Sequence, residues 1–168
     1  MRFFISGDIR TNSLLKLVIV FTLVFFFFLW LTNLLLYLKI GFSYDSVVEY
    51  YRGNEETFRP AKSYIGMLEE AHFHFFSMAI ILVTLNHLIL FTQIRNLWKL
   101  AIILASFISA FGDIAGGWLI LYVSPLFAYL KIASVVVLQV SLGVLLGLVV
   151  WFLYGKQKEG NYGNSVRQ

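Results

Sequence analysis

Four long apolar runs limit what this chain can fold into more strongly than any other feature of its sequence. They cover roughly residues 14–38, 62–92, 97–123 and 126–154, and a helix of about 20 apolar residues spans a bilayer. The chain is 60% hydrophobic and only 13% charged, which leaves too little polar surface to cover a water-soluble globule. The sequence therefore predicts an all-α integral membrane protein, a bundle of four transmembrane helices.

The connections between these runs are short, apart from the segment 39–61. Within it, Ser43 or Asp45 can cap a short amphipathic helix that ends at Gly53. Pro60 suits the first turn of the second long helix. We expect residues 1–154 to form one transmembrane domain with an outer loop at 39–61, and residues 155–168 to form a polar cytoplasmic tail.

The basic residues predict how the chain is oriented, because cytoplasmic loops carry an excess of Lys and Arg. Eight lie in the N-terminus, the second loop and the tail: Arg2, Arg10, Lys16, Arg95, Lys99, Lys156, Lys158 and Arg167. Five lie in the other two loops: Lys39, Arg52, Arg59, Lys62 and Lys131. This bias predicts a multi-pass protein with both termini in the cytoplasm.

Several kinds of chemistry are excluded or weakly supported. The chain has no cysteine, which removes disulfides, thiolate metal sites, iron–sulfur clusters and thiol catalysis. It lacks the glycine-rich pattern of a phosphate loop. It also lacks basic residues interleaved with aromatic ones outside the bilayer, so we expect no nucleic-acid partner.

Ionisable residues inside the apolar runs are the most informative polar feature, because each costs roughly 2.5–3.5 kcal/mol to insert at the centre of a membrane helix. All three histidines of the chain fall on the second run, with two acids beside them, and the third run contains one acid. These residues are Glu69, Glu70, His72, His74, His87 and Asp113. Each needs a partner or a use.

The spacing of polar and small residues predicts which helix faces meet. On the second helix, Glu70 and His74 share one side, whereas His72 points away from it. The third helix has a matching stripe, and the fourth has a shorter one, of residues that let helices approach and hydrogen-bond. The stripes are Ser106, Ser109, Ala110, Asp113, Gly116 and Gly117, and then Gln139, Gly143 and Gly147. We expect Glu70, His74 and Asp113, with Gln139 nearby, to form an outer cluster.

The histidine spacing resembles that of four-helix membrane b-type cytochromes, in which one helix carries two axial histidines thirteen to fifteen residues apart. His74 and His72 precede His87 by thirteen and fifteen residues. In that family, glycines on neighbouring helices leave room for the ring, and Gly112, Gly116, Gly117, Gly143 and Gly147 could do so here. No second helix supplies partner histidines.

The resemblance implies an electron-transfer subunit that binds haem b, with quinone as an exchange partner. The axial ligands that it implies first are His74 and His87, and His72 replaces His74 if the helix is rotated. Two-histidine ligation then requires a homodimer or another subunit. Met67 or Met78 is an alternative axial ligand.

Two other interpretations stay open. His74 and Glu70 lie one helical turn apart, and with Asp113 they could hold a divalent metal ion, or pass protons without a metal. Alternatively, the polar residues only hold helices together. The chain would then be a non-catalytic accessory subunit of a larger membrane complex.

Overall fold

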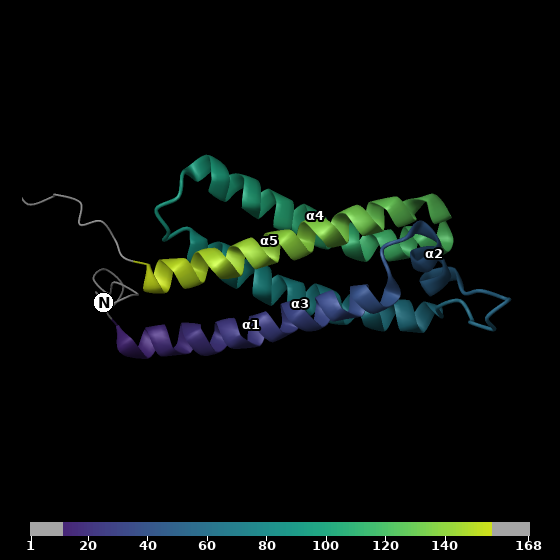
Figure 1. Cartoon of the computed structure of the whole chain (residues 1–168), viewed down its shortest axis with the longest axis horizontal. Helices are drawn as coiled ribbons and strands as arrows, with labels where there is room; N and C mark the ends of the chain where they lie inside the picture. The colour runs from purple at the N-terminus through teal and green to yellow at the C-terminus, as the bar shows by residue number, and fades with distance from the viewer. Residues whose placement is uncertain (1–11, 156–168) are drawn as a thin grey trace, which may run out of the picture.

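The computed structural model describes residues 12–155, which form long helices with one short helix across an end (Figure 1). Within that range the helices are α1 (Ser13–Ile40), α2 (Tyr44–Arg52), α3 (Tyr64–Ile89), α4 (Asn96–Tyr122), a 3-10 turn η1 (Pro125–Phe127) and α5 (Ala128–Tyr154). Four helical segments, α1, α3, α4 and η1–α5, are long and apolar enough to cross a membrane. The prediction of an all-α, four-helix integral membrane protein is confirmed.

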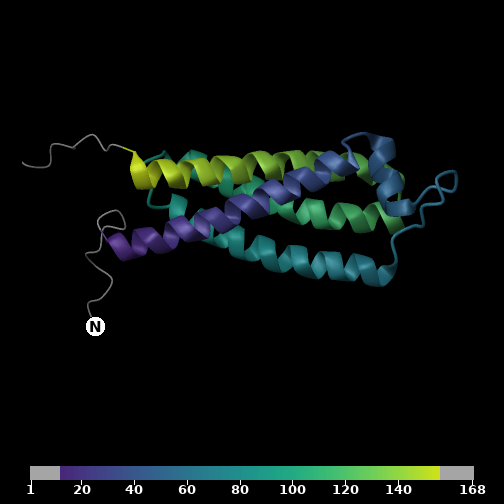
Figure 2. The same ribbon diagram turned by 60° about the horizontal axis from the view of Figure 1, so that its bottom comes forward.

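The two ends of the bundle differ in what they carry. The short helix α2 and the loop after it lie at one end, which we call the loop end (Figures 1 and 2). The start of α1 and the end of α5 lie at the other, the termini end, where Lys16 Nζ sits 4.2 Å from the centre of the Tyr154 ring. The expected tail lies outside the described residues, except for Gly155.

The helix boundaries follow from their capping groups. The α2 helix is capped by Ser43 and ends at Gly53, as the sequence predicted. The α3 helix begins at Tyr64, four residues after Pro60, and is capped by Ser63, so the expectation that Pro60 lies in its first turn is wrong. It ends at Ile89 rather than 92, where the turn that follows offers backbone carbonyl groups to the ammonium of Lys99.

The α4–α5 pair is the most closely packed contact of the bundle, because glycines on α4 let α5 approach. A Cβ added at Gly112 would lie 2.5 Å from Ser134 Oγ, and one at Gly116 would lie 3.1 Å from Lys131 Cβ. The predicted stripe on α4 is buried throughout. The small residues therefore bring α5, and with it Lys131, against α4.

The core divides into two apolar clusters with polar groups between and around them. The larger one fills the termini half, where α1, α3, α4 and α5 meet, and includes Ile81, Leu85 and Leu145, each fully buried. The smaller one lies under α2, around Tyr51. Arg52 fastens α2 to the bundle, since its Nε donates a hydrogen bond of 2.7 Å to the Ile120 carbonyl at the end of α4.

Candidate functional site

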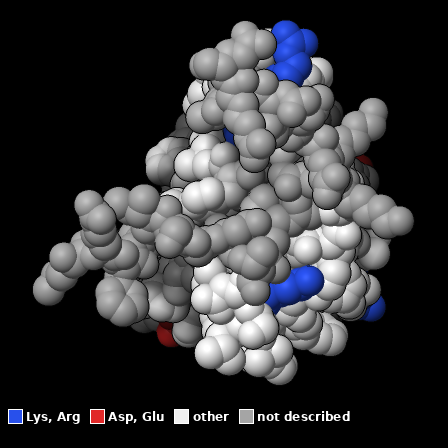
Figure 3. Space-filling view, turned by 90° about the vertical axis from the view of Figure 1, so that its left-hand side faces the viewer, with Lys and Arg blue, Asp and Glu red and all other residues white. Residues whose placement is uncertain are grey.

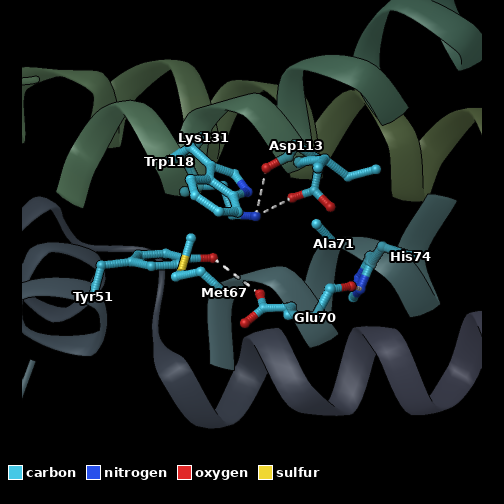
Figure 4. Close-up of a pocket in the computed structure, with 10 residues that line it drawn as sticks. Tyr51, Met67, Glu70, Ala71, His74, Asp113, Trp118 and Lys131 are labelled. Carbon is cyan, nitrogen blue, oxygen red and sulfur yellow. Dashed lines mark hydrogen bonds and ion pairs between the residues drawn. The ribbon is translucent and has the colours of Figure 1, made fainter. Parts of the chain in front are cut away.

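A buried ion pair lies in the loop half of the bundle. Lys131 Nζ on α5 is 2.6 Å from Asp113 Oδ1 on α4, and the two side chains are only 4% and 1% exposed. The same ammonium donates a second hydrogen bond, of 2.7 Å, to the Asp113 carbonyl oxygen (Figure 4). Tyr37 on α1 donates a third, of 2.7 Å, to Oδ1. We call Asp113 and Lys131 the interior pair.

Geometry of this kind is needed because two charges taken out of water lose several kcal/mol of solvation each. Lys131 can approach the Asp113 backbone since Gly116, one turn further along α4, leaves the space that a side chain would fill. The rings of Tyr37 and Tyr51 lie 5.6 and 5.5 Å from the ammonium nitrogen, which adds cation–π attraction. The pair is thus surrounded by groups from α1, α2, α4 and α5.

A second ion pair lies nearer the loop end. Glu70 on α3 pairs with Lys62 from the preceding loop, and their side chains are 28% and 21% exposed. Lys62 Nζ also donates a 2.9 Å hydrogen bond to Tyr50 OH. We call Glu70 and Lys62 the edge pair. Its partial exposure places the edge pair at the surface of the bundle.

Tyr51 lies between the two pairs. Its hydroxyl donates a long hydrogen bond of 3.4 Å to Glu70 Oε1, and its ring lies below Lys131 (Figure 4). Burial, followed by the charge of Glu70, raises the pKa of the Tyr51 phenol well above its usual value. The hydroxyl therefore keeps its proton and stays a hydrogen-bond donor at neutral pH.

The side chains of Glu70 and Asp113 both line one small cavity. Tyr51, Glu70, His74, Asp113 and Lys131 line it together with apolar residues of α3 and α4 (Figure 4). Its volume is about 10 Å³, which is close to the space that one water molecule requires. The lining offers enough polar groups to bind such a water, and with it to connect Glu70 and Asp113.

The expected outer cluster is therefore present in part. Glu70, His74 and Asp113 line one cavity, as the helix faces predicted. However, no three His, Asp or Glu side chains among residues 12–155 form a group that could hold a metal ion. Asp113 and Glu70 are each paired with a lysine instead. The expected metal set of these three residues is not assembled.

Gln139 stands apart from this cluster. It is buried, and its backbone carbonyl accepts a 3.0 Å hydrogen bond from Trp30 Nε1 on α1. Its side-chain amide has no hydrogen-bond partner among residues 12–155. A second polar contact in the interior joins Asn86 Nδ2 on α3 to Ser106 Oγ on α4 at 3.2 Å. These groups connect helices but do not extend the charged site.

The histidines occupy three different surroundings. His72 and His87 are exposed on the outside of α3, beside Phe73 and Phe91. His74 is half-buried, and its Nδ1 lies 3.2 Å from the Glu70 carbonyl oxygen. The cavity that His74 shares with Asp113, of about 10 Å³, is far smaller than the roughly 300–1,000 Å³ of a cofactor site. Within one described chain, the histidines do not form a two-histidine haem pocket.

The glycines expected to leave room for a haem ring mostly face protein atoms. Gly112 and Gly116 face α5, and Gly117 faces the Tyr51 ring, which would lie 2.9 Å from an added Cβ. Gly143 faces Trp30 at 3.6 Å. Only Gly147, of these five, has open space beside it. In the described chain, four of the five glycines serve helix packing.

Sequence reasoning missed Lys131, Tyr37 and Tyr51 as members of the site. Lys131 was assigned to a loop, although it is the one charged residue inside the fourth apolar run. A lone lysine in that run, with a lone aspartate in the run before it, was a signal for an ion pair. Nothing comparable marked the two tyrosines, because their contacts depend on how α1 and α2 pack.

Comparison with known proteins identifies a family: a family model for a transmembrane helical domain matches residues 41–160. The matched segment includes α2 through α5, and hence every residue of the two ion pairs. No curated protein and no solved structure matches the chain.

Breaking the interior pair should destabilise the protein far more than removing an exposed acid. We expect Asp113→Leu or Lys131→Met to cost about 3–5 kcal/mol of unfolding free energy, because the partner charge stays buried and unpaired. The double variant should cost less than either single change. Unfolding in detergent micelles measures this, with Glu55→Leu in the exposed loop as control; equal tolerance of Asp113→Leu and Glu55→Leu would contradict it.

Proposed function

The chain belongs to a family of transmembrane helical domains, and from that premise we propose that it is a proton-handling membrane protein. In this proposal, a proton passes between water at the loop end and Asp113 in the membrane interior. The observation that carries it is the small polar cavity that Glu70 and Asp113 share. A His and carboxylate site that passes protons was one of the alternatives left open by the sequence.

Each step of the route has a group suited to it. Glu70 is partly exposed and so can exchange protons with solvent. The cavity beside it has space for about one water molecule, which can transfer a proton between two carboxylates. Tyr51 remains protonated and fixes the position of Glu70 by its hydrogen bond.

Protonation of Asp113 would change its surroundings. The carboxylate is held by Lys131 and by the Tyr37 hydroxyl, and hydrogen bonds to a charged acceptor are roughly twice as strong as neutral ones. A proton on Asp113 weakens both contacts and leaves the Lys131 charge without its partner. The interior pair is therefore a site at which proton uptake can alter the contacts among α1, α4 and α5.

The site is open toward one end of the bundle. On the termini side of Asp113 lies the larger apolar cluster, in which Ile81, Leu85 and Leu145 are fully buried. The only hydrogen bond between polar side chains described there joins Asn86 and Ser106. We therefore assign proton exchange to the loop side alone.

Infrared spectroscopy in nanodiscs tests the proposal, because a protonated carboxyl in a dry site has its own carbonyl band. On acidification in steps, we expect such a band to appear in the wild type and to be absent in Asp113→Asn. After a pH jump, Glu70→Gln should slow its appearance by about tenfold or more, since a hydrogen-bonding carboxylate is lost from the route.

Glu55→Gln, in the exposed loop, is the control and should change neither the band nor its rate. The same band in Asp113→Asn would refute the assignment. If the wild type shows no band and purifies with larger subunits, the accessory-subunit interpretation would be favoured instead.

We further propose that the loop end faces outward and that both termini are cytoplasmic. The described segments at the termini end, 12–30, 80–100 and 140–155, contain Lys16, Arg95 and Lys99 and no acid. Seen from this end, the described surface shows basic groups, and acidic groups show only at its rim (Figure 3). Lys131 no longer counts for the outer loops because its ammonium is paired with Asp113 inside the bundle, whereas Lys99 bonds to the carbonyl groups of the turn after α3 at the termini end. The other predicted cytoplasmic bases, Arg2, Arg10, Lys156, Lys158 and Arg167, lie outside the described residues.

Thiol labelling can test this orientation cleanly, since the chain has no cysteine of its own. An impermeant maleimide added to intact cells should label Thr57→Cys, in the loop after α2. It should label Gln93→Cys, between α3 and α4, only after the cells are permeabilised. The reverse labelling pattern would show that the loop end is cytoplasmic and would contradict the proposed orientation.

Haem binding stays a second candidate, now between two copies of the chain. His72 and His87 are both exposed on α3 and lie fifteen residues apart, about 60° apart around a helix of 3.6 residues per turn. A second α3 packed on this side would bring two pairs of imidazoles together. That arrangement is a homodimer with electron transfer as its activity.

The optical spectrum of the purified protein tests the haem candidate. We expect a Soret band and a reduced α-band that are lost in His87→Ala, because an axial ligand is removed, and kept in His74→Ala. A colourless protein from haem-supplemented cells would exclude haem.

A further inference from the structure

The helices α1 and α5 leave an open groove between them in the termini half of the bundle. They meet where Trp30 Nε1 donates a 3.0 Å hydrogen bond to the Gln139 carbonyl, and they diverge toward the termini end (Figures 1 and 2). The groove has a volume of about 420 Å³. Its lining side chains come from residues 20–28 of α1 and 146–154 of α5, and all of them except Tyr154 are apolar. We call it the α1–α5 groove.

The α1–α5 groove has the length and surface that suit a hydrocarbon chain. Its lining residues Leu146 and Tyr154 lie eight positions apart on α5, which is about 12 Å along a helix. This is most of the depth of one leaflet, about half of a hydrocarbon core of roughly 30 Å. At the inner end, Phe27 packs against Trp30 with 5.9 Å between the ring centres. A lipid chain can therefore enter beside Tyr154 and lie along the groove.

An ammonium group stands at the outer end of the α1–α5 groove. Lys16 precedes the lining residues Val20 and Val24 by four and eight positions, so all three share one side of α1. Its Nζ lies 4.2 Å from the centre of the Tyr154 ring, a contact that attracts the charge without neutralising it. The described segments at this end, 12–30, 80–100 and 140–155, contain no acid. Within the described chain, Lys16 therefore has no anion to pair with at this end.

We propose that the α1–α5 groove and Lys16 bind one anionic phospholipid, with an acyl chain between the two helices and the phosphate beside the Lys16 ammonium. Basic groups next to gaps between spanning helices are suited to lipid phosphates. Tyr154 is placed as tyrosines at a membrane interface are, and its hydroxyl can donate to a phosphate oxygen. A zwitterionic phospholipid offers the same chain, but its own positive group opposes Lys16.

A lipid in this position adds packing where the bundle has least of it. Of the four spans, α1 buries the smallest share of its apolar window, and the α1–α5 groove lies along its termini half. The proposal does not depend on proton handling, because Asp113 and its cavity lie in the loop half. Its test can therefore fail or succeed independently of the infrared experiment.

Photochemical crosslinking of the full chain in nanodiscs tests the proposal. Two probes carry the same diazirine-bearing acyl chain, one on phosphatidylglycerol and the other on phosphatidylcholine, and each is diluted into unlabelled phosphatidylcholine. Mass spectrometry then measures the crosslinks at residues 20–28 and 146–154. We expect the phosphatidylglycerol probe to label these residues about fivefold more than the phosphatidylcholine probe, which is the factor that one lysine near an anionic lipid supplies.

Charge variants test the role of Lys16. Lys16→Gln should reduce labelling by the phosphatidylglycerol probe to the level of the phosphatidylcholine probe, because the positive charge is lost. Lys16→Arg should keep the difference, because the charge is retained. The matched control is Lys39→Gln, which removes an exposed lysine from the last turn of the same helix, at the other end of the bundle. This control should leave the labelling unchanged.

A second pair of variants tests the groove itself. Val150→Trp should abolish the labelling of the α1–α5 groove by filling it, whereas Val140→Trp makes the same change on an exposed part of α5 outside the groove and should not. Equal labelling by the two probes in the wild type would overturn the proposal. It would also be overturned if folded Lys16→Gln kept the preference, or if folded Val150→Trp kept the labelling.

Discussion

The interior pair determines much of how the loop half of the bundle is built. A carboxylate and an ammonium that are almost completely buried must lie close together and gain hydrogen bonds, because each alone loses several kcal/mol of solvation. Asp113 and Lys131 meet this requirement with contacts from three spanning helices. The small residues on α4 are what make it geometrically possible, since a side chain at Gly112 or Gly116 would push α5 away. The ion pair and the close α4–α5 packing therefore depend on each other.

The short helix α2 is part of the same arrangement and not a separate surface element. Arg52 bonds to the end of α4, and Tyr51 projects below Lys131 against Gly117. The Tyr51 ring covers the interior pair from the loop side, while its hydroxyl contacts Glu70. A segment that the sequence shows only as an amphipathic surface helix thus closes the charged site and links it to the aqueous edge.

Much of the fold could be predicted because membrane helices depend on local properties. Apolar run length identified the spanning helices, and Ser43 and Gly53 marked α2. The polar and small stripe on α4 also followed from helical spacing. The contacts between side chains on different helices were harder to predict, because they depend on how each helix is rotated about its axis and on the angle at which two helices cross. Lys131 lies only one turn after the start of α5, and this position near the helix end led to its assignment to a loop. Its side chain nevertheless passes Gly116 and points into the bundle.

The histidines also show how far helical spacing can predict the surroundings of a side chain. Their spacing correctly separated His72 from His74, since the first is exposed and the second half-buried. Their spacing alone could not show that His87 faces outward while its neighbour Asn86 faces the bundle. Exposure of His87 and burial of Asn86 follow from how α4 packs, with Asn86 bonded to Ser106. Neighbouring positions on a helix differ by about 100°, so a modest rotation decides which of two adjacent polar residues becomes structural and which meets lipid.

The distribution of polar groups makes the molecule asymmetric across the membrane. The loop half contains two ion pairs, two buried tyrosines and a small cavity, whereas the termini half is closed by a continuous apolar cluster. Between α1 and α3 the same loop half also opens sideways, into a separate groove lined by Asn33. His74 is the one side chain that lines both spaces. A change of charge at Asp113, as proposed above, would therefore act on the one imidazole that also faces the groove.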